Sequence, residues 1–455
     1  MSGDGRRYRF GPRERGGVLA GWRAGQILTV ALGLLIGVLV LRAQPNGAGV
    51  AVAVAILLAC AALATWPVSG RTGDQWLPVV VCWGTRRAVP RGRRRMDALA
   101  GLRLLNAGTR PMGMVHDQRE RTLTAALSLH GRGFALLGPD EQDRRVAGWS
   151  SVLATLARDG SPIRRVQWLA ASYPDQGHGV RSYLATHTEV DPVSACLASY
   201  EALLHDMDVD ACTHDVVLTV QVRITKSVET SAALLQREVA SLTRLLADAD
   251  VEVDAVLGAH DLAARLLRTY EARGAAEQEA TNLSDPWPMA MEEEWARLRV
   301  DGMFHATFWV AEWPRVDVRS DFLAPLLLGA ARLTLSVVME PLGPEKAVRK
   351  VEASRTADLA DTELRRRSGF MATARHSRQS EVLARREAEL ADGHASFRYA
   401  GFITVSAASE TELVGAVDIV QHAASQSRLV VRRLYGDQAS AYTCTLPLAR
   451  GLTGR

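Results

Sequence analysis

The segment LLHDMDVDACTHDVV, residues 203–217, holds the densest group of side chains in this chain that could do chemistry. Asp206, Asp208 and Asp210 stand at alternate positions, which is the spacing that opens a calcium-binding EF-hand loop. Ala211 stands where that loop needs glycine, and Val217 stands where it needs a bidentate glutamate. The pattern therefore favours a polar helix-to-strand connection over a calcium or zinc site. The candidate ligands are His205, Asp206, Asp208, Asp210, Cys212 and His214.

Nucleotide chemistry would need a phosphate-binding loop in which glycine directly precedes lysine. The lysines of this chain are Lys226, Lys346 and Lys350, and none of them follows glycine. The sequence also lacks a G-x-G-x-x-G turn, a G-x-S-x-G elbow and an H-E-x-x-H helix. We therefore expect no catalytic residue, no cofactor and no metal. Trp309 and Trp313 lie four residues apart on a predicted strand, and we expect them to pack in the core.

Composition limits the class of protein. The chain has 455 residues, of which 47% are hydrophobic and 23% are charged, so it is long enough for two or three domains with real cores. The formal charge of +4 is too small to argue for sequence-specific binding of nucleic acid. Its five cysteines are odd in number and far apart, which suits a reducing cytoplasm better than a disulfide framework.

Two apolar runs near the N-terminus must be explained first. Residues 24–41 and 43–70 carry no charge, and about 20 apolar residues suffice to cross a bilayer. The stretch RAQPNGAG, residues 42–49, supplies proline, asparagine and glycine for a tight turn between them. We expect a transmembrane helical hairpin with spans over about 24–42 and 47–68. The alternative is one span followed by a buried helix.

Arginines flank the hairpin and predict its orientation. The positive-inside rule places the arginine-rich flanks, and hence both termini, in the cytoplasm, with the cell membrane as the location. The short run WLPVVVCW, residues 76–83, is too short to span and should be a strand or an interfacial segment. The arginines behind it suit anionic lipid headgroups. The membrane-orienting residues are Arg6, Arg7, Arg9, Arg91, Arg93, Arg94 and Arg95.

Beyond residue 96 the pattern changes to short strands and amphipathic helices. We expect a hairpin over 295–314, with Asp301 and Gly302 in its turn. Strands are expected at 121–131, 163–174, 214–224, 251–257 and 331–342, and helices at 140–160, 229–249 and 260–273. A final strand, helix, strand unit should end the chain. The fold class is therefore α+β.

Two stretches of the cytoplasmic part resemble each other in their order of elements. Residues 222–267 and 403–448 each contain a strand, a helix that starts at Ser, Thr and Glu residues, a second strand and a further helical turn. We therefore expect two related α+β halves, each a mostly antiparallel sheet with helices on one face. The domain boundaries follow as 1–95 for the anchor, 96–280 and 281–455 for the halves, with a long helical insertion over 345–390.

A family resemblance extends over nearly the whole chain. The segments RRVQWLAASYPD, YEALLHD, LLQREVASLTRLL, VDGMFHATFWVAEWPRVDVRSDFLAPLLL, LTLSVVMEPLGPEKAVRKVEASRT, YAGFITVSAASETEL and RRLYGDQASAYTCTLPLARGL occur in this order. Together they resemble the N-terminal, non-ATPase domain of the large ATPases of conjugative type IV secretion systems. The stretch YRFGPRERGGVLAGWRAGQIL and the following hairpin are similar to the small two-span inner-membrane subunit of Gram-positive conjugation machines. The arginine-rich usage fits an actinobacterium.

The resemblance implies a membrane-anchored scaffold that recruits a separately encoded P-loop secretion ATPase. Other membrane subunits, membrane lipids and further copies of the chain are the remaining expected partners. In such ATPases the last Leu-Pro-Leu-rich stretch leads towards the motor domain, so we expect the motor to dock at Leu446, Pro447, Leu448 and Leu452. The alternatives are that these four residues fold back onto their own sheet, or that the chain is the two-span E component of an actinobacterial type VII secretion complex.

Overall fold

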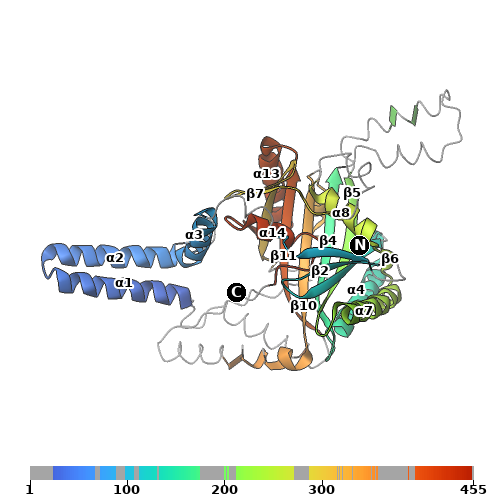
Figure 1. Ribbon diagram of the computed structural model, residues 1–455, viewed down its shortest axis with the longest axis horizontal. Helices are drawn as coiled ribbons and strands as arrows, with labels where there is room; N and C mark the ends of the chain where they lie inside the picture. The colour runs from blue at the N-terminus through green and yellow to red at the C-terminus, as the bar shows by residue number, and fades with distance from the viewer. Residues whose placement is uncertain are drawn as a thin grey trace.

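The computed structural model describes residues 24–66, 72–88, 98–106, 112–130, 133–174, 212–270, 286–314, 318–319, 321–329, 331–349 and 395–452, with a few shorter pieces between them. The predicted insertion over 345–390 falls mostly outside these residues. The fold is α+β: an apolar helical hairpin projects from a sheet that carries helices (Figure 1).

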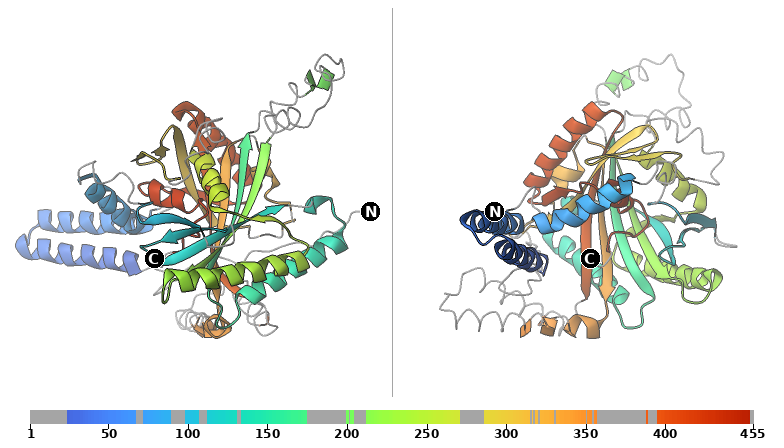
Figure 2. Two further views of the ribbon diagram at one scale, coloured as in Figure 1. Left: turned by 45° about the vertical axis from the view of Figure 1, so that its right-hand side comes forward. Right: turned by 60° about the vertical axis from the view of Figure 1, so that its left-hand side comes forward.

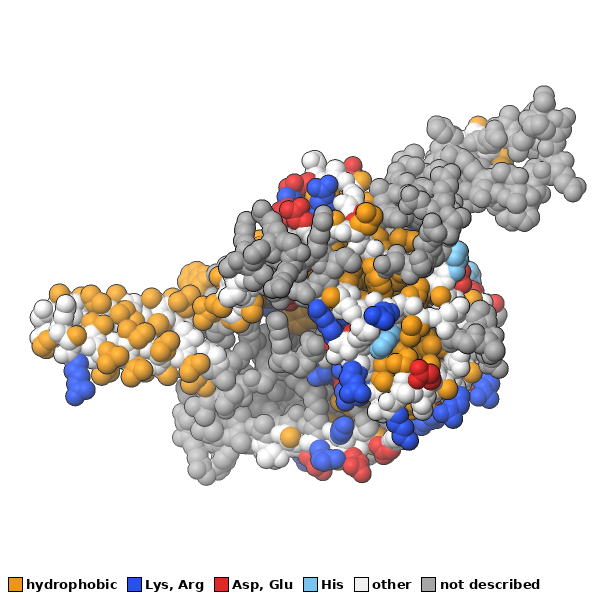
Figure 3. Space-filling model, viewed as in Figure 1, with side chains coloured by type: hydrophobic (Ala, Val, Ile, Leu, Met, Phe, Trp, Pro, Cys, Tyr) orange, Lys and Arg blue, Asp and Glu red, His pale blue; other side chains and the backbone are white. Residues whose placement is uncertain are grey.

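Helices α1 (Ala24–Ala43) and α2 (Gly47–Thr65) form the expected hairpin. Both are long and apolar enough to cross a membrane. The turn between them ends at Asn46, whose side-chain oxygen accepts a hydrogen bond of 2.8 Å from the Gly49 backbone amide and so caps α2. Most of the hairpin surface is exposed hydrocarbon (Figure 3), which water would not tolerate over this length but lipid would.

Small residues let the two hairpin helices approach each other. Gly33 and Gly37 lie four residues apart on the buried side of α1. A Cβ atom on Gly33 would lie 2.8 Å from that of Cys60, and one on Gly37 would lie 3.8 Å from that of Ala53. Close backbone approach at small residues is how helices associate in lipid, where apolar side chains gain nothing by meeting each other.

Residues 73–88 form helix α3 (Gly73–Ala88), so the strand predicted as one possibility for 76–83 is wrong. Pro78 lies inside this helix. The valine run favours a strand by propensity, but Trp76, Val79 and Trp83 recur at helical spacing and pack on the sheet domain. This tertiary contact overrides the local preference.

The part of the chain after α3 is built on one 12-stranded sheet in which every described pairing is antiparallel. Its strands are β1 (Leu102–Asn106), β2 (Gly113–Asp117), β3 (Thr122–His130), β4 (Ile163–Pro174), β5 (Cys212–Arg223), β6 (Glu252–Val256), β7 (Met291–Glu293), β8 (Leu298–Val300), β9 (Met303–Glu312), β10 (Leu333–Leu342), β11 (Ser396–Ala407) and β12 (Val430–Arg433). The main order is β1-β2-β3-β5-β4-β10-β11-β9-β8-β7, with β6 beside β3 and β12 beside β9.

The two predicted halves have the same topology. The first runs β1-β2-β3-α4-β4-β5-α7-β6-α8, and the second runs β7-β8-β9-α10-β10-β11-α13-β12-α14. Equivalent helices even share a cap: Ser227 accepts from the Thr230 amide at the start of α7, and Ser409 accepts from the Glu412 amide at the start of α13, both at 3.2 Å. The helices are α4 (Pro139–Leu156), α7 (Val228–Asp248), α8 (Ala259–Tyr270), α10 (Ala324–Leu327), α13 (Glu410–Gln426) and α14 (Gln438–Thr443).

The halves share one sheet instead of forming two. Strand β4 of the first half pairs with β10 of the second, from Val166 opposite Met339 to Ser172 opposite Leu333. Each half alone would leave one edge of its outer strand, β4 or β10, without a partner, so joining the two edges satisfies the backbone groups of both. The sheet is therefore continuous through the middle of the molecule (Figure 1).

Both faces of the sheet are covered, so the expectation of helices on one face only is wrong. One face is apolar and packs against α4, α7, α10 and α13; α4 and α7 lie side by side along it (Figure 2). The other face packs against α8, α14 and the end of the chain. Along each central strand the residues alternate between these faces, and on the second face many of them are polar.

Candidate functional site

The middle of the second face carries a stripe of buried polar side chains. They come from alternate positions of the central strands, where period-2 geometry points them to one side. Each is at most 2% exposed: Thr124, Arg165, Gln167, Thr219, Gln221, His305, Thr307, Ser336 and Thr404. Buried polar atoms need hydrogen-bond partners. Residues 444–452, near the C-terminus, provide many of those partners, and we call this segment the C-terminal strap.

Gln167 is the centre of the contact between stripe and strap. Its Nε2 lies 2.9 Å from the Cys444 carbonyl oxygen and 3.0 Å from that of Leu446, and its Oε1 accepts from the Ala449 amide at 2.7 Å. Ser336 Oγ donates to the Cys444 carbonyl at 2.7 Å. The strap is irregular and has no neighbouring strand. The side-chain amide of Gln167 makes the hydrogen bonds to its backbone that such a strand would make.

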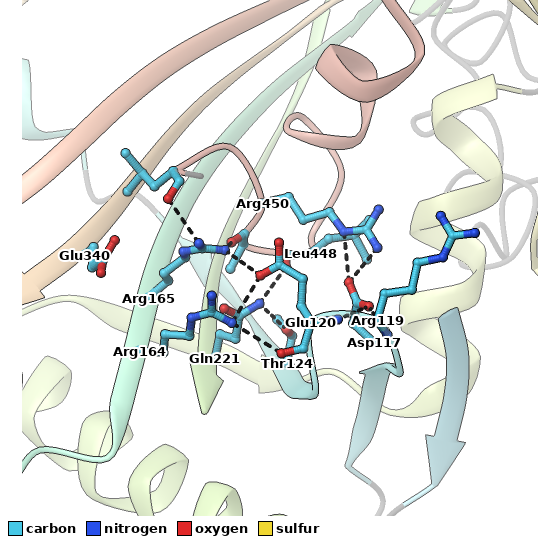
Figure 4. A network of polar contacts seen from close by, with 12 residues as sticks. Asp117, Arg119, Glu120, Thr124, Arg164, Arg165, Gln221, Glu340, Leu448 and Arg450 are labelled. Atoms are coloured by element: carbon cyan, nitrogen blue, oxygen red, sulfur yellow. Dashed lines mark hydrogen bonds and ion pairs between the residues drawn. The ribbon is translucent and has the colours of Figure 1, made fainter. Parts of the chain in front are cut away.

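Two further side chains of the stripe bind strap carbonyls. Gln221 Nε2 donates to the Leu448 carbonyl at 3.1 Å. The Arg165 guanidinium donates to the Ala449 carbonyl at 3.3 Å and to the Leu452 carbonyl at 3.1 Å (Figure 4). Because these donors stand on strands of the first half and the strap follows the second half, the contact ties the two halves together.

Ion pairs hold both sides of this contact. Arg450 of the strap binds the Asp117 carboxylate and the Ala98 carbonyl, and Glu120 accepts from Arg165 at 3.2 Å (Figure 4). Burial lowers the pKa of Arg165, while the carboxylate of Glu120 opposes that effect. A buried charge of this kind persists only when it is paired and hydrogen-bonded.

The strap corrects the expected docking site. Leu446 is 2% exposed, Leu448 is 3% exposed and Leu452 is 7% exposed, and Pro447 is also buried. The alternative of folding back onto the sheet therefore holds, because the leucines complete an apolar cluster and the strap backbone satisfies the polar stripe. An ATPase cannot reach these four side chains while the strap is in place.

His305 and Tyr442 form a buried pair beside the strap. Their ring centroids are 4.6 Å apart, His305 Nδ1 lies 2.9 Å from Ser406 Oγ, and Tyr442 donates to Thr269 at 3.0 Å. Burial, helped by the charge of Arg332, lowers the pKa of His305 to about 3. The imidazole is therefore neutral at physiological pH. Its Nε2 has no hydrogen-bond partner in the described part of the chain.

The Cys444 thiol is also buried, and burial raises its pKa to about 12. A thiol that stays protonated is a poor nucleophile and a poor metal ligand. Cys444 therefore takes part in packing. Its Sγ lies 3.4 Å from the Ser440 carbonyl oxygen.

A second candidate surface joins the hairpin to the sheet. Trp295, between β7 and β8, stacks on Trp76 with 5.7 Å between the ring centroids and on Tyr435 with 6.2 Å between them. Its ring also makes an edge contact with Trp83, at a centroid distance of 5.6 Å. Gly436 has a φ of +71°, and a Cβ there would lie 2.7 Å from the Trp295 ring. We call Trp76, Trp83, Trp295 and Tyr435 the aromatic junction. It fixes α3 against the sheet.

One cavity of about 360 Å³ lies between the end of α4 and the end of β10. Charged side chains of both signs line it, among them Arg158, Arg164, Glu340 and Glu345. Arg164 pairs with Glu120 at 3.1 Å and Arg349 pairs with Glu345 at 3.1 Å. Most of the basic groups that line the cavity are therefore paired with carboxylates.

Several residues singled out in the sequence lie outside the described residues. These are Arg6, Arg7, Arg9, Arg91, Arg93, Arg94, Arg95, His205, Asp206, Asp208 and Asp210. Cys212 and His214 are described and lie at the start of β5, opposite Pro174 and Ser172. Trp309 and Trp313 are half-buried; Trp313 packs edge-on against Tyr399 at 6.0 Å.

Sequence reasoning missed the polar stripe, the strap contact and Trp295. One signal was available: strands β4 and β5 alternate apolar residues with Arg165, Gln167, Thr219 and Gln221. Such alternation is typical of a strand with one face in water. The same pattern arises when a polar backbone covers that face, so the pattern alone does not separate the two cases.

Comparison with protein families and with curated proteins found no match for this chain.

Proposed function

We propose that this protein is a non-catalytic, membrane-anchored scaffold of a type IV-like conjugative secretion apparatus. The observation that supports this best is the contact between the membrane anchor and the sheet domain. The apolar hairpin continues into α3, and the aromatic junction holds α3 on a sheet that both halves share. A flexible tether would need no such contact, whereas a scaffold must hold its partners at a set place relative to the bilayer.

In this proposal the hairpin lies in the cell membrane, and both termini are cytoplasmic. The arginines on either side of the hairpin favour that orientation by the positive-inside rule. A separately encoded P-loop ATPase and other membrane subunits are the partners, and several copies of this chain assemble with them. The ATPase binds a surface of the sheet domain other than the buried strap. Lipids contact the hairpin, and the chain reads no nucleic acid sequence.

Topology is tested with a reporter enzyme that is active only outside the cytoplasmic membrane. A fusion after Arg95 should be inactive, because the sheet domain is cytoplasmic. The matched fusion at Asn46, in the turn between α1 and α2, should be active. Activity after Arg95 would refute the orientation.

The scaffold role is tested by purifying the tagged, full-length protein from detergent-solubilised membranes of its own host. Mass spectrometry should find a P-loop ATPase and further membrane subunits in amounts comparable to the bait. A two-span membrane protein with the same tag is the control. Type VII core subunits in place of the ATPase would favour the type VII alternative. If neither group exceeds its level in the control, the scaffold proposal fails.

A further inference from the structure

Helix α3 has two apolar sides, and the described residues of the protein cover only one of them. Trp76 and Trp83 face the sheet domain through the aromatic junction, and Val79 lies between them against Gly436. On the outward side Leu77 is 66% exposed, Val80 is 50% exposed and Val81 is 54% exposed. A helix that is apolar on both sides needs a second apolar neighbour.

The position of α3 indicates what that neighbour is. Its first residue, Gly73, lies so close to the last turns of α2 that a Cβ there would be 2.7 Å from the Leu63 carbonyl oxygen. In the right-hand view of Figure 2 the hairpin is foreshortened, whereas α3 extends away from its end and lies closer to the plane of the picture, so α3 makes a large angle with the hairpin. If the hairpin crosses the bilayer, α3 therefore lies along the membrane surface.

The apolar surface is also continuous from one element to the next. The hairpin exposes large apolar side chains such as Leu28, at 70%, and Leu58, at 66%. Helix α3 lies between the hairpin and the sheet (Figure 1) and contacts both α1 and α2. Its exposed apolar side chains therefore continue the apolar surface of the hairpin at the end nearer the sheet. A helix lying in the interface buries its apolar side about 5–10 Å into the boundary between headgroups and acyl chains.

We propose that α3 is an interfacial helix, with Leu77, Val80 and Val81 in the lipid and Trp76 and Trp83 bound to the sheet domain. The proposal rests on the proposed membrane insertion of the hairpin. The occupant of the outward face is the bilayer. Lipid on one side and Trp295 on the other hold α3 in place, so the sheet lies at a set distance from the membrane. Tryptophans of interfacial helices usually face the lipid, whereas those of α3 bind protein.

The experiment places a photoreactive benzophenone amino acid at single positions of the full-length protein in native membranes. Val81 is the test position. Leu35, 58% exposed in α1, reports membrane insertion of the hairpin. Leu136, 92% exposed before α4, is the control on the sheet domain. After illumination, mass spectrometry identifies each adduct as lipid or protein.

We expect lipid adducts at Val81 and Leu35 in similar yield, and at least tenfold less at Leu136. Lipid at Leu35 without lipid at Val81 would overturn the placement of α3 and leave the hairpin in the membrane. A protein adduct at Val81, including one to a second copy of this chain, would also overturn it. No lipid at Leu35 would refute membrane insertion and the inference with it. Equal lipid adducts at Val81 and Leu136 would show that α3 has no special position.

Discussion

At the scale of single residues, the burial of His305 in the polar stripe makes protonation of its imidazole unfavourable. The ring is fully buried against Tyr442, and its only hydrogen bond among the described residues joins Nδ1 and Ser406 Oγ. Its folded-state pKa, about 3, lies below the ordinary value of 6.5. Between these two pH values the unfolded chain binds a proton that the folded chain does not bind. Stability should therefore fall as the pH falls below about 6.5.

We expect the His305→Gln variant to lose much of this pH dependence. For one such group the difference in the free energy of unfolding between pH 7.5 and pH 5 is about 2 kcal/mol. Thermal unfolding of both proteins in detergent at the two pH values measures it. The matched control is His422→Gln on α13, which replaces an exposed histidine in the same way. Equal acid sensitivity in the wild type and His305→Gln would contradict the assignment.

The backbone conformation at the end of the strap requires glycine at position 451. Its φ is +118°, and a Cβ atom would lie 2.6 Å from the ring of Phe402. Gly451→Ala should lower the free energy of unfolding by about 2 kcal/mol or more, because backbone strain and a steric clash coincide. Gly415→Ala in α13, where a Cβ would meet nothing within 4 Å, should be neutral or stabilising. Denaturant unfolding compares the two variants, and equal midpoints would show that the strap tolerates a side chain.

At the scale of elements, the hairpin depends on close contact between α1 and α2. A Cβ on Gly37 would lie 3.8 Å from that of Ala53, which is the usual separation in a disulfide. In a Cys60→Ala background, Gly37→Cys with Ala53→Cys should therefore cross-link on mild oxidation. Val38→Cys with Ala53→Cys should not, because Val38 points outward and is 59% exposed. Mass spectrometry of the hairpin peptide detects the bond.

Adding Gly33→Leu should abolish this cross-link, because a leucine side chain would collide with residue 60 and separate the helices. Ala31→Leu places the same leucine side chain on the exposed side of α1 and should have no effect. A cross-link that survives Gly33→Leu would mean that the two helices do not pack through this face.

At the scale of the whole molecule, the protein should neither bind nor hydrolyse ATP. None of its lysines follows glycine, so no phosphate loop can be completed. Calorimetric titration of the purified protein with ATP and Mg²⁺ should give only the heat of dilution, and the co-purified ATPase serves as the positive control. Saturable binding to the scaffold alone would refute its non-catalytic role.

The sequence determined the local elements and their repetition. The expected strand at 163–174 coincides with β4, Asp301 and Gly302 form the turn before β9, and α7 and α13 start at equivalent serines. The hairpin was equally predictable, because two uncharged runs of this length form few structures other than membrane-spanning helices. These features depend on contacts between near neighbours in the chain and on the period of the apolar residues, which the sequence displays directly.

The tertiary structure decided the rest. The pairing of β4 with β10, the helical form of α3 and the burial of the strap all depend on residues far apart in the chain. Gln167 binds the amide of Ala449, which lies 282 positions later in the chain. From the sequence, a polar residue at every second position of a strand points to water. Only the folded chain shows that another part of the backbone takes the place of that water.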